Sequence, residues 1–284
     1  MDNFEIKLEP VIRQSKNKFL RNLPHWAIRM IEKIIKADDL NRLLRTYGHL
    51  QGMDFVRALL FDEFKVNVNY LGSKKFDPEK RYVYVANHPL GGIDALSHLN
   101  LVYERHGDVV KSPSNELFNY IPNLRPLIFG VNVFNMNDRQ RLLELDRLFA
   151  SDYQIMIFPA GEVSRLINFK IRDPQWKKTF ITLTVRHKRH IVPSFISGHN
   201  SFWFYFWAKL RKLSGIKMYI ETMLLPREMF RGYNMNIYFW TLDPISWEQI
   251  ANSGKDYNWW TQHIYNQVYD AGKTLKKYLK SHKA

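Results

Sequence analysis

A histidine and an aspartate lie close together in the stretch N-H-P-L-G-G-I-D, which occupies positions 87–94. The imidazole of His88 could take up a proton near neutral pH. A carboxylate at Asp94, bonded to the other ring nitrogen, would fix the tautomer of His88 and stabilise its imidazolium form. The chain contains no G-x-S-x-G motif and no cysteine. The pair is therefore expected to activate a hydroxyl or amine of a bound substrate rather than a nucleophile of the protein.

The segments around this loop would hold it at one edge of a sheet. Residues 82–86 are aromatic and β-branched and predict a buried strand, and a helix is expected from about residue 95. Gly91 and Gly92 allow the backbone to bend sharply and to approach a ligand closely. The loop thus places both chemical groups at the end of a strand.

Strands and helices alternate along the rest of the chain, which predicts an α/β fold. Loops at 87–94, 135–139, 159–165 and 193–200 follow predicted strands, and ligands gather at the carboxyl ends of strands in such sheets. We therefore expect the four loops to converge. The predicted strands are 65–70, 82–86, 108–111, 128–134, 154–158, 191–196 and 236–240, and the predicted helices are 52–63, 95–106, 139–149, 176–187, 201–213 and 256–280, with a helical turn at 115–120.

Charge and composition limit the partners and the class of protein. The 284 residues carry a formal charge of +15, and cysteine is absent. An anionic partner is therefore expected, and a disulfide framework, a thiolate metal site and a catalytic thiol are excluded. The chain is expected to consist of a helical N-terminal region at 1–60, an α/β domain at 61–250 and a basic C-terminal helix at 251–284.

The sequence shows neither a secretory signal nor a membrane-spanning helix. The first residues include acids, and no apolar segment follows them. The stretch 191–208, which contains no Lys, Arg, Asp or Glu, is interrupted by Pro193 and Gly198. Any contact with a membrane is therefore expected at its surface, where the basic residues between 16 and 36 could face anionic headgroups. The alternative is that the N-terminal helices cover the edge of the core.

Two blocks of the sequence resemble those of the glycerolipid (lysophosphatidate-type) acyltransferase superfamily. The first block of that superfamily is N-H-x4-D, and the stretch 87–94 matches it with one extra residue before the acid. The hemolysin-like bacterial branch, which includes ornithine- and glycine-lipid O-acyltransferases, has NHPLGxxD, which is satisfied here. The third block, FPEGTRS, resembles F-P-A-G-E-V-S-R at 158–165, with the acid and the arginine each displaced by two positions. The second and fourth blocks resemble 131–134, with Arg139 nearby, and 191–193.

The resemblance implies a mixed central sheet flanked by helices, and the activity of an O-acyltransferase. His88 would remove the proton from the hydroxyl of a lysolipid as that hydroxyl attacks an acyl thioester, and Asp94 would orient His88. Backbone amides of Gly91 and Gly92, or of Gly161, are candidates for stabilising the oxyanion. The acyl donor would be acyl carrier protein or coenzyme A bearing a fatty acid. No metal or bound cofactor is expected, because thioester cleavage needs none.

The resemblance also implies which residues bind the acceptor. Arg165, together with Arg139, would pair with an anionic headgroup through the two-pronged guanidinium. Glu162 would support Arg165 or bind the acceptor, and Gly161 and Ser164 belong to the same loop. The displaced arginine favours a carboxylate-bearing acceptor, such as an N-acyl amino acid with a 3-hydroxy acyl chain (lyso-ornithine or lyso-glycine lipid). The alternative acceptor is 1-acylglycerol-3-phosphate.

Several residues admit a second interpretation. Arg165 could instead form a surface ion pair with Glu162 or Asp173. The aromatic run 202–207 could pack in the core, or it could face a membrane or an acyl chain. The remaining histidines, including His98, have no partner at a recognisable spacing and are expected to be structural or exposed.

A non-enzymatic protein is the alternative of another class. A basic chain rich in aromatic residues could bind nucleic acid or serve as a scaffold on an anionic membrane. No RNP, helix-turn-helix or OB pattern is present, so a nucleic-acid partner is not expected. The favoured hypothesis is a peripheral enzyme on the cytoplasmic face of the inner membrane.

Overall fold

The computed structural model describes residues 7–14, 18–113, 121–129, 138–215 and 220–282. The predicted helical turn at 115–120 and the second sequence block at 131–134 lie outside these residues. Of the strand predicted at 128–134, the structure describes only its first two residues, which form a strand.

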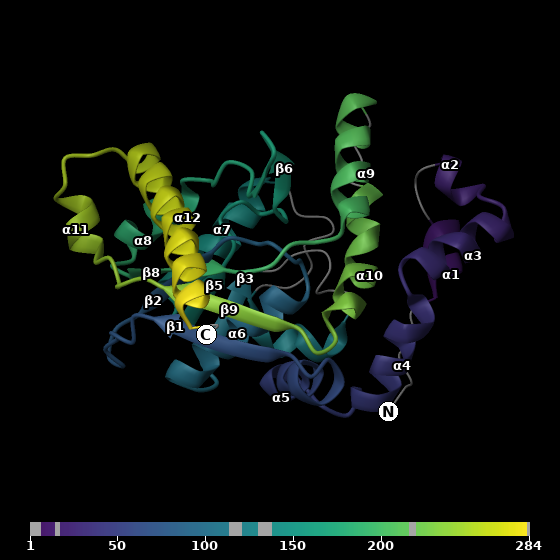
Figure 1. The fold of residues 1–284 in the computed structure, drawn as a ribbon, viewed down its shortest axis with the longest axis horizontal. Helices are drawn as coiled ribbons and strands as arrows, with labels where there is room; N and C mark the ends of the chain where they lie inside the picture. The colour runs from purple at the N-terminus through teal and green to yellow at the C-terminus, as the bar shows by residue number, and fades with distance from the viewer. Residues whose placement is uncertain (1–6, 15–17, 114–120, 130–137, 216–219, 283–284) are drawn as a thin grey trace.

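A seven-stranded mixed sheet lies at the centre of the described fold (Figure 1), with the strands in the order β1-β9-β8-β2-β5-β3-β4. The central strand β2 pairs in parallel with β5 on one side and β8 on the other. β9 runs antiparallel to β8 and parallel to β1. The expected α/β fold with a mixed central sheet is therefore confirmed. The strands of this sheet are β1 (Asn67–Gly72), β2 (Tyr82–Ala86), β3 (Val110–Pro113), β4 (Ile128–Phe129), β5 (Gln154–Ile157), β8 (His190–Ile196) and β9 (Asn236–Thr241).

Strand β2 is buried along its whole length, as its run of aromatic and β-branched residues predicts. Successive side chains point to opposite faces of the sheet. Tyr82, Tyr84 and Ala86 belong to the core on one face. Val83 and Val85 belong to the core on the other face. The sheet therefore has an apolar core on each side.

Helices cover both of these faces. The first core is closed by α5, η1 and α6, and the second by α7, α8 and α12. In Figure 1 the long helix α12 crosses the sheet on one face. The helices are α1 (Leu8–Arg13), α2 (Lys18–Arg21), α3 (His25–Ile34), α4 (Ala37–Tyr47), α5 (Gly52–Arg57), η1 (Ala58–Glu63), α6 (Ile93–His106), η3 (Pro122–Leu127), α7 (Asp138–Ala150), α8 (Thr179–Arg186), α9 (Phe202–Leu213), η5 (Ile220–Leu224), α10 (Leu225–Met229), η6 (Phe230–Gly232), α11 (Trp247–Ala251) and α12 (Tyr257–Ser281).

Helices α1 to α4 lie to one side of the sheet, beyond α9 and α10 (Figure 1). None of the helices that the structure describes is long and apolar enough to cross a lipid bilayer. The division of the chain into regions at 1–60, 61–250 and 251–284 stays a prediction.

Two local details differ from the sequence analysis. An antiparallel hairpin, formed by β6 (Arg165–Ile167) and β7 (Lys170–Arg172), follows the third sequence block and was not predicted. The helix expected from residue 176 begins at Thr179. The amide of Lys177 donates to the carbonyl of Pro159, at 3.1 Å. This bond holds the segment before the helix against the third-block loop, at 159–165, so the helix begins later.

Candidate active site

The predicted pair of His88 and Asp94 is formed. Nδ1 of His88 lies 3.0 Å from Oδ2 of Asp94, whose side chain is fully buried. The same carboxylate accepts from the amide of Leu90, at 2.8 Å, and from that of Ala95, at 2.9 Å. A carboxylate acceptor on Nδ1 fixes the proton there, which leaves the lone pair of Nε2 to receive a proton from a substrate.

The His88 loop is bound to the strands on both sides of β2. The side-chain amide of Asn87, which is buried, donates to the carbonyl of Ile196 and accepts from its amide, at 2.9 and 2.7 Å. On the β5 side, the ring of His88 stacks on that of Phe158, with centroids 3.8 Å apart and 10° between the planes. Because β5, β2 and β8 are parallel, the loops at 87–94, 159–165 and 193–200 lie at one edge of the sheet.

Asp173 joins the His88 loop to the third-block loop. Its Oδ1 accepts from the amide of His88, at 3.1 Å, and from the hydroxyl of Ser164, at 2.5 Å. The amide of Ser164 in turn donates to the carbonyl of His88, at 2.7 Å. Burial raises the pKa of Asp173, and these hydrogen bonds oppose the shift. Ser164 is itself buried, so in this structure its hydroxyl holds the two loops together.

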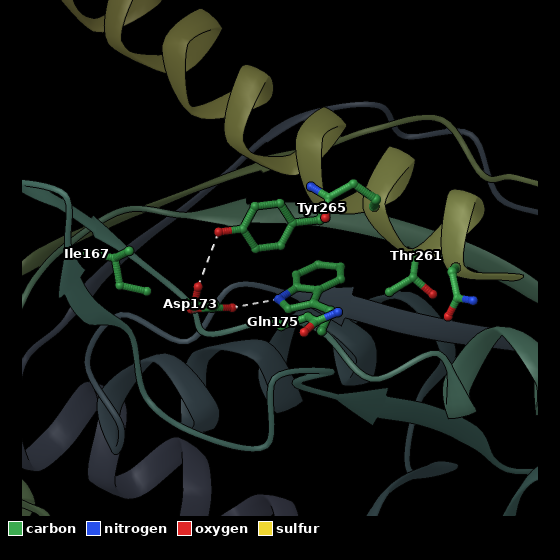
Figure 2. A pocket seen from close by; sticks show the side chains of 8 residues that line it. Ile167, Asp173, Gln175, Thr261 and Tyr265 are labelled. Carbon is green, nitrogen blue, oxygen red and sulfur yellow. Dashed lines mark hydrogen bonds between the residues drawn. The ribbon is translucent and has the colours of Figure 1, made fainter. Parts of the chain in front are cut away.

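The other side of Asp173 faces a pocket next to α12 (Figure 2). Its Oδ2 accepts from Nε1 of Trp176, at 2.9 Å, and its carbonyl accepts from the hydroxyl of Tyr265, at 3.2 Å. The pocket has a volume of about 310 Å³. It is lined by Ile167, Asp173, Gln175, Trp176, Asn258, Thr261, Gln262 and Tyr265. Asp173 therefore connects this pocket with the backbone of the His88 loop.

Arg165 lies in a charged cluster instead of on an open surface. Its guanidinium is 3.0 Å from Oε1 of Glu221, which is fully buried, and 3.7 Å from Oε2 of Glu162. It also lies over the ring of Phe204, 5.2 Å from the centroid. Glu221 accepts from Nε of Arg211 as well, at 2.8 Å. Glu221 could not be predicted as a partner of Arg165, because η5 lies far along the chain and its sequence has no pattern that points to Arg165.

The two glycines of the loop have a packing role. Gly91 has a φ of +91°, and a side chain there would place its Cβ 2.8 Å from Leu225 of α10. A Cβ on Gly92 would lie 3.0 Å from the sulfur of Met229, on the same helix. The close approach that the glycines allow is therefore to α10.

The candidate oxyanion donors differ in what their amides bind. The amide of Gly161 donates to the carbonyl of Phe158, at 2.9 Å, and closes a turn. Within the part of the chain that the structure describes, the amides of Gly91 and Gly92 donate to no main-chain carbonyl. Arg139 is exposed at the beginning of α7. Its predicted role in substrate binding stays a prediction.

A second histidine lies one helical turn beyond Asp94. His98 is fully buried, and its ring is 5.5 Å from that of Phe158. Burial lowers its pKa to about 3, so the imidazole is neutral. Neither ring nitrogen has a hydrogen-bond partner among the described residues. Nothing in the spacing of the sequence distinguishes His98 from an exposed histidine.

Among the residues that the structure describes, no group of three or more His, Cys, Asp or Glu could hold a metal ion.

Comparison with known proteins places the chain among the acyltransferases. Residues 11–258 match the model of the family described as "Acyltransferase". The chain is 33% identical over 268 residues to a lyso-glycine lipid O-acyltransferase of Bacteroides thetaiotaomicron, covering 94% of this chain and 97% of the relative. It is 30% identical over 267 residues to the enzyme of the same name from Phocaeicola vulgatus, covering 94% and 95%.

A solved structure, the 1-acyl-sn-glycerophosphate (LPA) acyltransferase PlsC from Thermotoga maritima, is similar with a TM-score of 0.48 at 13% identity, covering 88% of this chain and 92% of that one. The resemblance that the first and third sequence blocks indicated is thus confirmed by the family match and the two relatives. The chain belongs to the acyltransferase family and is an O-acyltransferase.

Proposed function

We propose that this enzyme transfers a fatty acyl group from an acyl thioester to the hydroxyl of a lysolipid whose headgroup carries a carboxylate, as in lyso-glycine lipid. The observation that carries the proposal is the 3.0 Å contact between His88 Nδ1 and the buried carboxylate of Asp94. The names of the two relatives support the class of acceptor.

In the proposed reaction, Nε2 of His88 takes the proton of the acceptor hydroxyl while the oxygen attacks the thioester carbonyl. The new C–O bond forms, the C–S bond breaks, and the imidazolium returns the proton to the departing thiolate. Asp94 stabilises the imidazolium between these two steps. Phe158 covers one face of the ring and keeps it from turning. The amides of Gly91 and Gly92 are the proposed donors to the oxyanion.

The charges around Arg165 support a carboxylate headgroup over a phosphate monoester. Arg165 and Arg211 carry two positive charges, and Glu162 and Glu221 carry two negative ones. Among the residues that the structure describes in this cluster, the positive and negative charges therefore balance. A cluster with no net charge does not offset the second negative charge of a phosphate monoester, whereas a single carboxylate can still pair with a guanidinium.

We further propose that the enzyme acts as a peripheral protein at the cytoplasmic face of the inner membrane, with acyl carrier protein or acyl-coenzyme A as donor. Trp26 and Met30 are exposed at the same side of α3, together with the basic residues Arg29 and Lys33. This helix has the composition of one that lies at an anionic interface. The net charge of +15 supports an anionic membrane and an anionic donor alike.

The proposal is tested by offering three acceptors to the purified enzyme: lyso-glycine lipid, lyso-ornithine lipid and 1-acylglycerol-3-phosphate. Each is combined with acyl-coenzyme A or with acyl carrier protein bearing the same chain, and products are measured by mass spectrometry. We expect a diacylated glycine lipid, formed at least about 10-fold faster than phosphatidate, because the cluster at Arg165 does not offset a second negative charge. Preference for 1-acylglycerol-3-phosphate would overturn the choice of acceptor. No transfer to any acceptor from either donor would overturn the proposal.

A further inference from the structure

Helix α9 packs against the protein with one face and presents an apolar face to solvent. Phe204, Tyr205 and Ala208 are buried. The exposed apolar residues follow the three- and four-residue steps of one helical stripe. They are Phe202, Trp203, Phe206, Trp207, Leu210 and Leu213, and those at the two ends, Phe202 and Leu213, are exposed by 73% and 76%. Figure 1 shows α9 standing upright beside the sheet.

The β6–β7 hairpin ends in an exposed phenylalanine. Asn168 and Phe169 have φ angles of +48° and +59° at the two-residue turn. Asparagine tolerates this conformation, but a large side chain at positive φ costs about 1–2 kcal/mol. Phe169 is 96% exposed, so contacts within the chain do not offset this cost. Leu166 and Ile167 of the same hairpin are also exposed.

Arg165 contacts the elements that carry both apolar surfaces. Arg165 begins β6, and its guanidinium lies over Phe204, on the buried side of α9. Strand β6 contacts α9 directly. Ser164, one residue earlier, is bonded to the backbone of His88. A lipid surface covering α9 and the hairpin would therefore lie next to the charged cluster and close to the catalytic loop.

The charges on these elements select an anionic surface. Helix α9, at 202–213, and the hairpin, at 165–172, contain no Asp or Glu. They contain Arg165, Lys170, Arg172, Lys209, Arg211 and Lys212. An exposed apolar stripe with basic neighbours is typical of segments that lie in an anionic lipid interface. A second copy of this chain meeting the same surface would bring the exposed Lys170, Lys209 and Lys212 against the same three residues of its partner, which disfavours self-association.

We propose that α9 and the β6–β7 hairpin form the surface by which the enzyme docks on an anionic bilayer, with Phe169, Phe202 and Leu213 entering the headgroup region. If the acceptor is a lysolipid, as in the proposed function, its headgroup reaches Arg165 from the bilayer while its acyl chain stays among the lipids. The N-terminal helix α3 is a second contact with the bilayer, whereas the α9–hairpin surface positions the site.

Vesicle binding tests the surface without reference to catalysis. The variant Phe169→Ser/Phe202→Ser/Leu213→Ser is compared with the wild type on phosphatidylglycerol-containing and pure phosphatidylcholine vesicles. Its matched control is Phe76→Ser/Tyr153→Ser/Trp259→Ser, which removes three apolar side chains exposed elsewhere. We expect the first variant to bind the anionic vesicles at least about 30-fold more weakly, and the control to bind within about threefold of the wild type. Equal binding by the first variant and the wild type would overturn the proposal, as would an equal loss in the control.

A single label locates the contact. Since the chain contains no cysteine, Phe169→Cys accepts one environment-sensitive dye, and Asn252→Cys, at an exposed position, serves as its control. We expect a blue shift of the dye at position 169 on anionic vesicles and no shift at 252. No shift at 169 would contradict the docking surface. A second copy of the chain is the other possible occupant of this surface, and sedimentation of the unlabelled proteins tests it. A wild type that is dimeric and a triple serine variant that is monomeric would assign the surface to a second copy and overturn the proposal.

Activity assays separate this proposal from the proposed function. The triple serine variant is expected to acylate a short-chain acceptor dissolved below its critical micelle concentration at the wild-type rate. With the acceptor embedded in vesicles, its rate should fall at least about 10-fold. The docking role would be contradicted if the variant lost activity with both the dissolved and the embedded acceptor. It would also be contradicted if the variant kept full activity with both. Absence of transfer by the wild type itself would contradict the proposed function alone.

Discussion

The His88 loop and the Arg165 segment differ in where their partners come from. In the loop, Asp94 binds His88, Leu90 and Ala95. All of these residues lie in one short stretch of chain, at 88–95, which ends in the first turn of α6. The segment around Arg165 depends on Glu221 and Phe204, which belong to η5 and α9. The first site is thus determined by local sequence, and the second by the way distant elements pack.

This difference decides how each site should respond to substitution. A local site can lose a catalytic group without losing its shape, because its backbone is fixed by neighbours and by strand β2. A site assembled from distant elements uses buried charges to hold those elements together, so that removing one charge affects folding as well as binding. Substitutions in the first region should therefore change mainly activity, and those in the second should change stability as well.

The largest effect is expected for Asp94→Asn. Asparagine is nearly the same size but cannot stabilise an imidazolium as a carboxylate does, so kcat should fall by about 10³-fold with little change in the acceptor KM. Steady-state kinetics measure kcat and KM, and a urea titration checks that the variant is folded. The matched control is Asp152→Asn, whose side chain is fully exposed. A fall of less than about 10-fold would show that the pair does not act together.

Glu221→Gln should mainly lower stability. The substitution leaves Arg165 and Arg211 facing a neutral group in a site that is mostly closed to solvent, which is expected to cost about 3 kcal/mol of unfolding free energy. Glu162→Gln removes a partly exposed partner at 3.7 Å and should cost less than about 0.5 kcal/mol. Urea unfolding of both variants measures the difference. Equal stability of the two variants would remove the contrast between the two regions.

His98→Leu should make the protein less sensitive to acid. The pKa of His98 is lowered to about 3, whereas the imidazole of the unfolded chain titrates near its ordinary value of about 6.5. Between these values the unfolded state binds a proton that the native state does not, so stability is full above pH 6.5 and falls as the pH falls toward 3. At pH 5 this difference is about 2 kcal/mol.

Urea unfolding at pH 7 and pH 5 checks this prediction. We expect the wild type to lose about 2 kcal/mol more than His98→Leu between the two pH values. His49→Leu, at an exposed position, should behave as the wild type does. The same acid sensitivity in His98→Leu and the wild type would show that His98 does not remain neutral on folding.

Asp173→Asn tests the link between the two regions, with the smallest expected effect. Asparagine can still accept from the amide of His88 and from Ser164, but its amide group cannot accept from Trp176. The loops should therefore stay connected but less well placed, and kcat should fall about 10-fold with an unchanged pH profile for the remaining activity. A shifted pH profile would indicate that Asp173 takes part in proton transfer and does not only position the loop.

The strands of the fold could largely be predicted from sequence, because short apolar runs such as 82–86 and 191–196 are typical of strands buried inside a sheet. The hairpin at 165–172 could not, since its turn, Asn168-Phe169, lacks the glycine that usually identifies a two-residue turn. The run 202–207 was open to two interpretations. Phe204 is in the core, as one of them expects, and Phe202 is exposed, so its contact with a membrane or an acyl chain stays a prediction.

Some contacts of the candidate site could also be predicted from sequence, and others could not. The pairing of His88 with Asp94 could be predicted, because the loop that carries both is short. The positions of Glu221 and Asp173 could not, because nothing in their own segments indicates which distant group they bind. The glycines at 91 and 92 were expected to let the backbone approach a ligand. The structure shows that they lie close to α10, and the approach to a ligand stays a prediction.

In the proposed reaction, one imidazole, held by a buried carboxylate, activates the acceptor. A single-turnover assay of His88→Ala with acyl thioester and lysolipid tests this role, on protein shown by circular dichroism to be folded and by sedimentation to bind vesicles. We predict at least about 10³-fold slower transfer than in the wild type, with vesicle binding unchanged. Transfer by folded His88→Ala at a rate near that of the wild type would contradict the account.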